Sequence, residues 1–167
     1  MDDVNGTLAG LKSELSRSCQ VKSSDDLQVG DIVYVELDKN DGLVLNGKYV
    51  TRLKYVVVAG AKSNAKEVCA VLINTSNDYF DDPDWKSEQY LLRQADYPEI
   101  LSYDSWLDCT DVKELLVRKI CSKGAEIKGR LNDADLERVM KIINNSDYVP
   151  VHIKKVYGIK KYVESIN

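Results

Sequence analysis

Hydrophobic and polar positions follow a helical spacing near the N-terminus and strand-like spacings after it. Apolar residues recur at i, i+4, i+7 and i+11, and this stripe predicts an N-terminal amphipathic helix: Val4, Leu8, Leu11 and Leu15. Residues 31–37 (DIVYVEL) instead alternate, with Val33, Val35 and Leu37 on one face and strong β propensity throughout. The alternation predicts the first strand of a sheet.

Two near-continuous apolar runs, KYVVVAGA and KEVCAVLINT, come next and are separated by the turn KSN. Runs of this kind predict strands that are covered on both faces, as in a small closed barrel. Between the first strand and these runs, Asp-Gly and Asn-Gly dipeptides bracket residues 43–45. Such dipeptides favour type I′ turns, so we expect a small β excursion at an exposed tip.

The second half of the chain opens with a long acidic loop, NDYFDDPDW, and continues with short strands that are broken at Pro98. Thr110 and Asp111 then offer N-cap chemistry for a helix whose apolar stripe is Val112, Leu115, Leu116 and Ile120. A second helix, begun by Asn132 and Asp133, has the stripe Leu136, Val139, Met140 and Ile143. The pattern of the tail fits a strand as well as a helix.

Strands that are grouped together, with helices before and after them, favour an α+β fold over one in which strands and helices alternate. We therefore predict a mainly β domain with helices, built on an SH3-like barrel. The expected parts are an N-terminal helix and linker (1–24), the barrel with its terminal helices (25–146) and a basic C-terminal tail (147–167).

Composition and charge narrow the classes of function. The 167 residues carry a formal net charge of −4, so bulk electrostatic attraction to nucleic acid is not expected, although residues 117–130 and 152–162 are locally basic. No signal peptide or run of 18 apolar residues occurs, which predicts a cytoplasmic protein without membrane association. The four scattered cysteines form no CxxC pair, which favours reduced thiols over a zinc site or a disulfide scaffold.

Well-known catalytic motifs are absent from the sequence. It contains no GxGxxG, P-loop, HExxH, GxSxG or EF-hand pattern, so no cofactor and no metal site are expected. The single histidine, His152, stands between Val151 and Ile153 and is interpreted as a packed or surface side chain. A mechanism based on a Ser-His-Asp triad therefore has no support.

One polar constellation remains, at the ends of the two apolar runs. Arg52 and Lys54 precede the first run, and Asn74, Thr75 and Ser76 end the second. In a hairpin or barrel these ends can meet at one rim, where an arginine with nearby hydroxyls suits phosphodiester cleavage. The alternative is that the cations keep a strand end in water beside a polar turn.

The order of these elements resembles the MazF/PemK/Kid family of toxin ribonucleases, in the CcdB/Kid superfamily. LQVGDIVYVELD resembles the family's opening barrel strand, NGKYVTRLKYVVVAG its basic loop and next strand, and EVCAVLINTS the strand that ends in hydroxyl residues. Residues 103–143 follow the family's later order of strand, helix, turn and final helix. The resemblance spans about residues 27–145, and Leu53 stands where the family has a proline after its arginine.

The resemblance implies a toxin-like homodimer that binds and cleaves single-stranded RNA without metal, and that a partner antitoxin blocks. Carried over by position, Arg52 would stabilise the phosphate, and Thr75 and Ser76 would supply hydroxyls. The family's acid and base have no direct counterpart here, and Asp78 or Asp81 would substitute as the acid. Lys54, Asn74 and Lys48 are the expected substrate-binding residues. The acidic loop is interpreted as a solvated surface, a cover for a basic groove or a Mg²⁺ or Ca²⁺ site. The alternative function is a non-catalytic SH3-like protein-binding module.

Overall fold

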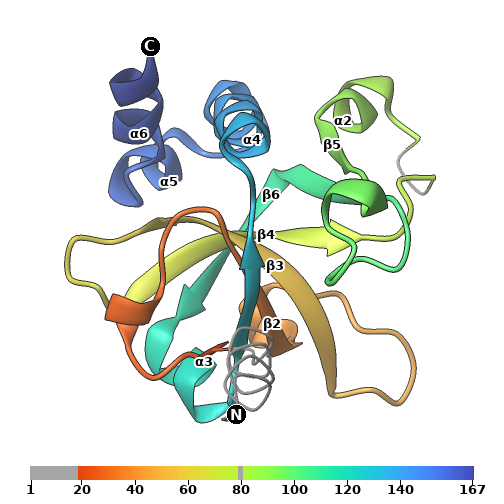
Figure 1. The fold of residues 1–167 in the computed structure, drawn as a ribbon, viewed down its shortest axis with the longest axis vertical. Coiled ribbons are helices and arrows are strands. Elements are labelled where there is room, and N and C mark those ends of the chain that lie inside the picture. The colour runs from red at the N-terminus through yellow and green to blue at the C-terminus, as the bar shows by residue number, and fades with distance from the viewer. Residues whose placement is uncertain (1–18, 79–80) are drawn as a thin grey trace, which may run out of the picture.

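The computed structural model describes residues 19–78 and 81–167, and its centre is one antiparallel sheet of seven strands (Figure 1). The strands are β1 (Cys19–Gln20), β2 (Asp31–Asp38), β3 (Thr51–Ala61), β4 (Glu67–Asn74), β5 (Gln89–Leu92), β6 (Ser105–Leu116) and β7 (Glu126–Arg130). Their order across the sheet is β1-β7-β2-β3-β4-β6-β5. The middle of the chain therefore forms the middle of the sheet.

Five α-helices and three short 3₁₀ turns accompany the sheet in the described part of the chain. They are α2 (Pro83–Ser87), α3 (Val117–Ser122), α4 (Asp133–Asn145), α5 (Val151–Val156), α6 (Ile159–Ile166), η1 (Ser24–Asp26), η2 (Lys39–Asp41) and η3 (Gln94–Asp96). Figure 1 shows α4, α5 and α6 side by side over one face of the sheet, with α3 beyond the other.

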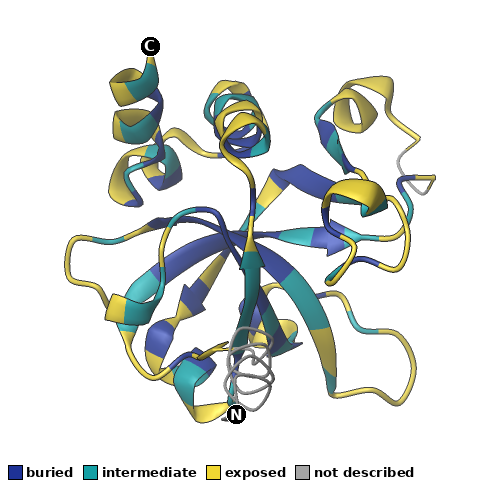
Figure 2. Cartoon of the chain, viewed as in Figure 1, coloured by how far each residue is buried: buried dark blue, intermediate teal, exposed yellow. Residues whose placement is uncertain are grey.

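Both faces of the central strands are buried, as their near-continuous apolar runs predict (Figure 2). On one face, Val57 and Val71 pack with side chains of α4, α5 and α6. On the other, Val56 and Ala70 pack with β2 and α3. Because successive side chains of a strand point to opposite faces, each of these strands contributes to two separate cores.

The α+β class, with grouped strands and helices at the ends, is confirmed. The sheet, however, is open: its edge strands are β1 and β5, at opposite ends of the strand order. β1 has two residues and β5 has four, so neither offers a long ladder with which the sheet could close. The expected closed SH3-like barrel is replaced by this open sheet in the described residues.

Two sequence-based predictions of local structure are wrong. The helix expected from Thr110 and Asp111 is a strand as far as Leu116, and only α3 is helical. Residues 113–116 alternate between buried and exposed positions, and pairing with β4 outweighs their helical spacing. The expected β excursion at residues 43–45 is a loop that follows η2.

The predicted second helix is confirmed as α4, whose N-cap Asn132 accepts a hydrogen bond from the backbone N of Asp135 at 2.8 Å. The ambiguous tail forms α5 and α6, and the carbonyl of Tyr157 between them accepts a hydrogen bond from the Ala61 backbone N at 3.1 Å. The tail is therefore packed against β3. The expected N-terminal helix lies largely in residues 1–18, outside the described residues.

Candidate functional site

Five of the seven sequence-predicted site residues line one cavity of about 540 Å³: Arg52, Lys54, Asn74, Thr75 and Ser76. They meet because β3 and β4 are antiparallel neighbours, with Val56 opposite Leu72. Continuing that register by two residues sets Lys54 opposite Asn74, and the Lys54 Nζ donates a hydrogen bond to the Asn74 Oδ1 at 3.1 Å. The start of one strand and the end of the next thus share one rim.

The other two predicted residues do not line this cavity. Lys48 is exposed in the loop of residues 42–50. Asp78 is also exposed, and its backbone N donates to the Ser76 Oγ at 3.1 Å in a local turn. That bond fixes the hydroxyl at the end of β4, so Asp78 contributes to the site through its backbone.

The third wall of the cavity comes from β6, with the side chains of Asp108, Asp111 and Lys113. Leu107 pairs with Ile73 and Val112 pairs with Val71, so residues 108–111 all lie opposite the single residue Leu72. This irregularity is a large β-bulge, and bulges commonly redirect side chains beside functional sites. Sequence analysis missed these residues because it assigned Thr110 and Asp111 to the cap of a helix.

Buried hydrogen bonds hold the bulge in place. The Asp108 Oδ1 accepts from the Gln89 Nε2 at 2.8 Å, from the Thr110 Oγ1 at 2.6 Å and from the Thr110 backbone N at 3.1 Å. Asp108 is 8% exposed, so these donors replace much of the water that would solvate its carboxylate. The carboxylate therefore organises the wall of the cavity at the point where β6 departs from regular pairing.

Two lysines fix the loop that borders the cavity. The Lys113 Nζ donates to the Asp111 Oδ2 and to the Gly42 carbonyl, each at 2.6 Å. The Lys119 Nζ binds Asp38 at 2.8 Å and Asp41 at 2.7 Å, at the two ends of η2. The hydrogen bond from Lys119 lowers the pKa of Asp38. The start of the loop at residue 42 is thereby held against β6 and α3.

Arg52 and Lys54 both bring positive charge to the cavity, and neither forms an ion pair with a described carboxylate. Both side chains lie on the same face of β3, because they are two residues apart in a strand. Burial, and to a smaller extent the charge of Arg52, lowers the pKa of Lys54. The amine of Lys54 is therefore easier to deprotonate than that of an ordinary lysine.

Large apolar side chains are exposed on the loop beside this cavity (Val44, Tyr49 and Val50) and at the start of β3 (Leu53). Val44 is 83% exposed and Tyr49 is 75% exposed. A second hollow of about 380 Å³ between this loop and β3 is lined by Tyr49 and shares Val44, Asn46 and Arg52 with the first. An aromatic face and an arginine side by side suit a ligand that has both a flat ring and an anionic group.

Within residues 19–78 and 81–167, no three His, Cys, Asp or Glu side chains gather in the manner of metal ligands. None of the helices in these residues has the length and apolar character needed to span a membrane.

The cavity's charged and hydroxyl groups can bind an anion and position a phosphodiester. A comparison with known proteins finds no family model and no curated protein that matches the chain.

Proposed function

We propose that the protein binds single-stranded RNA in the Arg52 cavity and cleaves it without a metal ion, as the toxin-like component of a toxin-antitoxin pair. One observation carries the proposal: Arg52, Thr75 and Ser76, to which the MazF/PemK-like resemblance gives the phosphate-stabilising and hydroxyl roles, line a single cavity. Its volume of about 540 Å³ is within the range of small-molecule and cofactor sites, so a nucleotide unit fits it.

In the proposed reaction the ribose 2′-hydroxyl attacks the adjacent phosphorus, and the bond from phosphorus to the 5′-oxygen breaks. The products are a 2′,3′-cyclic phosphate and a 5′-hydroxyl. Arg52 stabilises the negative charge that develops on the phosphoryl oxygens, and Thr75 and Ser76 position the ribose or the phosphate.

Lys54 takes the proton-transfer role in this reaction, in place of Asp78, which was expected to act as an acid. It lines the cavity and Asp78 does not. Its lowered pKa gives a larger fraction of free amine at neutral pH than an ordinary lysine has, and the amine accepts the 2′-hydroxyl proton. The departing 5′-oxygen takes a proton from the solvent.

The location and partners belong to the same proposal. By resemblance, the protein would act in the cytoplasm as a homodimer, and an antitoxin protein would block its RNA site. The apolar side chains Val44, Tyr49 and Val50 support a contact surface beside the cavity, because soluble monomers rarely expose large apolar patches.

The test is cleavage of a mixed-sequence single-stranded RNA by the purified full chain in EDTA. We expect wild type to cut and Arg52→Ala to be slower by about 100-fold or more, the usual cost of losing a transition-state contact. Arg93→Ala is the matched control, since Arg93 is exposed on a different loop and does not line the cavity. It should cut at the wild-type rate.

RNA affinity, measured in parallel by fluorescence anisotropy, separates binding from cleavage. If wild type binds RNA and Arg52→Ala binds more weakly, but neither cuts, the cavity is an RNA-binding site without nuclease activity. If wild type neither binds nor cuts, the proposed function is wrong. The search should then turn to protein partners, as for a non-catalytic binding module.

A further inference from the structure

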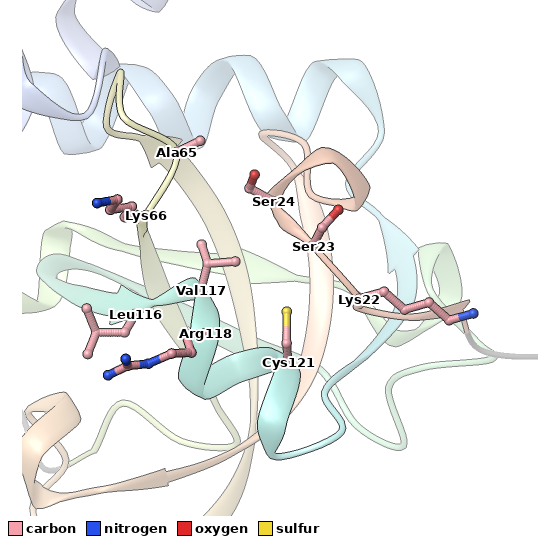
Figure 3. Close-up of a pocket in the computed structure, with 9 residues that line it drawn as sticks. All are labelled: Lys22, Ser23, Ser24, Ala65, Lys66, Leu116, Val117, Arg118 and Cys121. Atoms are coloured by element: carbon pink, nitrogen blue, oxygen red, sulfur yellow. The ribbon is translucent and has the colours of Figure 1, made fainter.

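A second groove, which shares no lining residue with the Arg52 cavity, has a lining of different chemistry (Figure 3). It measures about 670 Å³ and is formed by four chain segments: Lys22–Ser24, Ala65–Lys66, Leu116–Arg118 and Cys121. Backbone hydrogen bonds fix its walls, from the Val117 N to the Lys66 carbonyl at 3.0 Å and from the Val21 N to the Ala125 carbonyl at 2.8 Å. The groove is therefore a feature of the folded sheet.

The groove combines an apolar floor with a cationic rim. Leu116, Val117 and Cys121 supply the floor, and Leu116 is 46% exposed although it is a large apolar side chain. Lys22 lies on one side of the groove, and Lys66 and Arg118 lie on the other, with their charged ends directed outward along the rim (Figure 3). Its lining contains no Asp or Glu among the described residues, and none of the three cations forms an ion pair with another described residue.

We propose that this groove binds a short acidic, amphipathic segment of a partner protein. Apolar side chains of that segment would cover Leu116, Val117 and Cys121, and flanking Asp or Glu side chains would meet the cations on both sides. The charge pattern favours this occupant: three cations without an ion-pair partner among the described residues surround an apolar strip. The formal net charge of the whole chain is −4, so the basic rim is a local feature. The inference is independent of the RNA proposal.

Cys121 gives a readout that is specific to the groove. It lines the groove and is partly exposed, whereas Cys69 and Cys109 are buried, and burial raises the pKa of the Cys69 thiol to about 12. Cys19 is exposed, so Cys19→Ser leaves Cys121 as the reactive thiol of the described cysteines. The rate of Cys121 alkylation in this full-length variant then reports whether the groove is covered.

The probe is a 12-residue synthetic peptide with leucines on one face and glutamates beside them, and its control replaces each glutamate with lysine. We expect the acidic peptide at ten times its Kd to slow Cys121 alkylation about tenfold, because only the free groove reacts. The lysine peptide should leave the rate unchanged. If the acidic peptide at ~1 mM does not slow the reaction, or if both peptides slow it equally, the proposal is wrong.

Charge reversal supplies the matched variants. Lys66→Glu with Arg118→Glu should weaken binding of the acidic peptide by about tenfold or more. Lys160→Glu with Lys161→Glu makes the same change in net charge on exposed positions of α6 and should change the affinity by about twofold at most.

A last variant tests the chain's own N-terminus as the occupant. Leu8→Asp with Leu11→Asp alters the apolar stripe in residues 1–18. We expect this variant to leave the rate of Cys121 alkylation without peptide at the wild-type value. If the alkylation rate rises severalfold, the groove is occupied by the chain's own first residues, and the partner proposal is overturned.

Discussion

Replacement of Asp108 by alanine tests whether a buried carboxylate shapes the wall of the Arg52 cavity. Its Oδ1 accepts hydrogen bonds from the Gln89 Nε2 and from the hydroxyl and backbone N of Thr110. Alanine removes the acceptor and leaves these donors in an interior where Gln89 is 6% exposed and Thr110 is 9% exposed. The bulge of β6 should then rearrange or admit water.

The expected loss of unfolding free energy follows from those three bonds. A hydrogen bond to a charged group contributes about 1.5–3 kcal/mol, and the cost of burying the carboxylate offsets part of the sum. Bonds that share one oxygen do not add, so we expect Asp108→Ala to lose about 3 kcal/mol in total. Asp108→Asn keeps an acceptor but not the charge, and should lose about half as much.

Urea denaturation followed by tryptophan fluorescence measures both variants against wild type. For a chain of this length, about 3 kcal/mol corresponds to a fall in Tm of about 6–12 °C, which calorimetry can check. A loss below about 1 kcal/mol for Asp108→Ala, or an equal loss for both variants, would refute the role assigned to the carboxylate. In the folded fraction, weaker RNA binding by Asp108→Ala than by Asp108→Asn would link the bulge to the cavity.

Two further predictions concern a strand glycine and a lysine. A Cβ on Gly60 would clash with the backbone carbonyl of Tyr157, whereas a Cβ on Gly129 would meet only the flexible end of Ile100. In urea denaturation, the free energy of unfolding should therefore fall by about 3 kcal/mol for Gly60→Ala and by about 1 kcal/mol for Gly129→Ala. Equal losses would contradict the packing of the tail against β3. Because the pKa of Lys54 is lowered and the free amine is the proposed base, the RNA cleavage rate should rise with pH and level off below the ordinary lysine pKa. Lys54→Ala should lose that rise, and an unchanged pH profile would exclude Lys54 as the base.

The sequence predicts the centre of the fold because its signals there are local and consistent. The runs that became β3 and β4 are apolar at nearly every position, and a short turn leaves them few partners other than each other. The same reasoning placed Arg52 and Lys54 near the end of β4, since the two ends of a hairpin meet. α4 also has both a clear apolar stripe and a capping asparagine.

The failure at residues 110–116 has a different cause. Their apolar residues recur at three- and four-residue intervals, so the segment taken alone fits a helix. In the fold, the edge of β4 offers hydrogen bonds and a buried face to these residues, and Lys113 and Leu115 turn inward as strand residues. A partner that lies some forty positions earlier in the chain decides the structure, and no local pattern reports it.

That failure also concealed the third wall of the candidate site. Arg52 and Lys54 are visible as cations at a strand end. Asp108 and Asp111 instead line the cavity from the bulge of β6 opposite Leu72, and Lys113 lines it from the regular pairing that follows the bulge. The cations and hydroxyls alone would bind any exposed anion. The buried carboxylate and the lysine that holds Gly42 add a fixed third wall, and such a wall would position the phosphodiester of the proposed substrate for in-line attack. If the folded fraction of Asp108→Asn loses discrimination between RNA and free phosphate, the wall provides specificity in addition to the attraction and charge stabilisation proposed for Arg52.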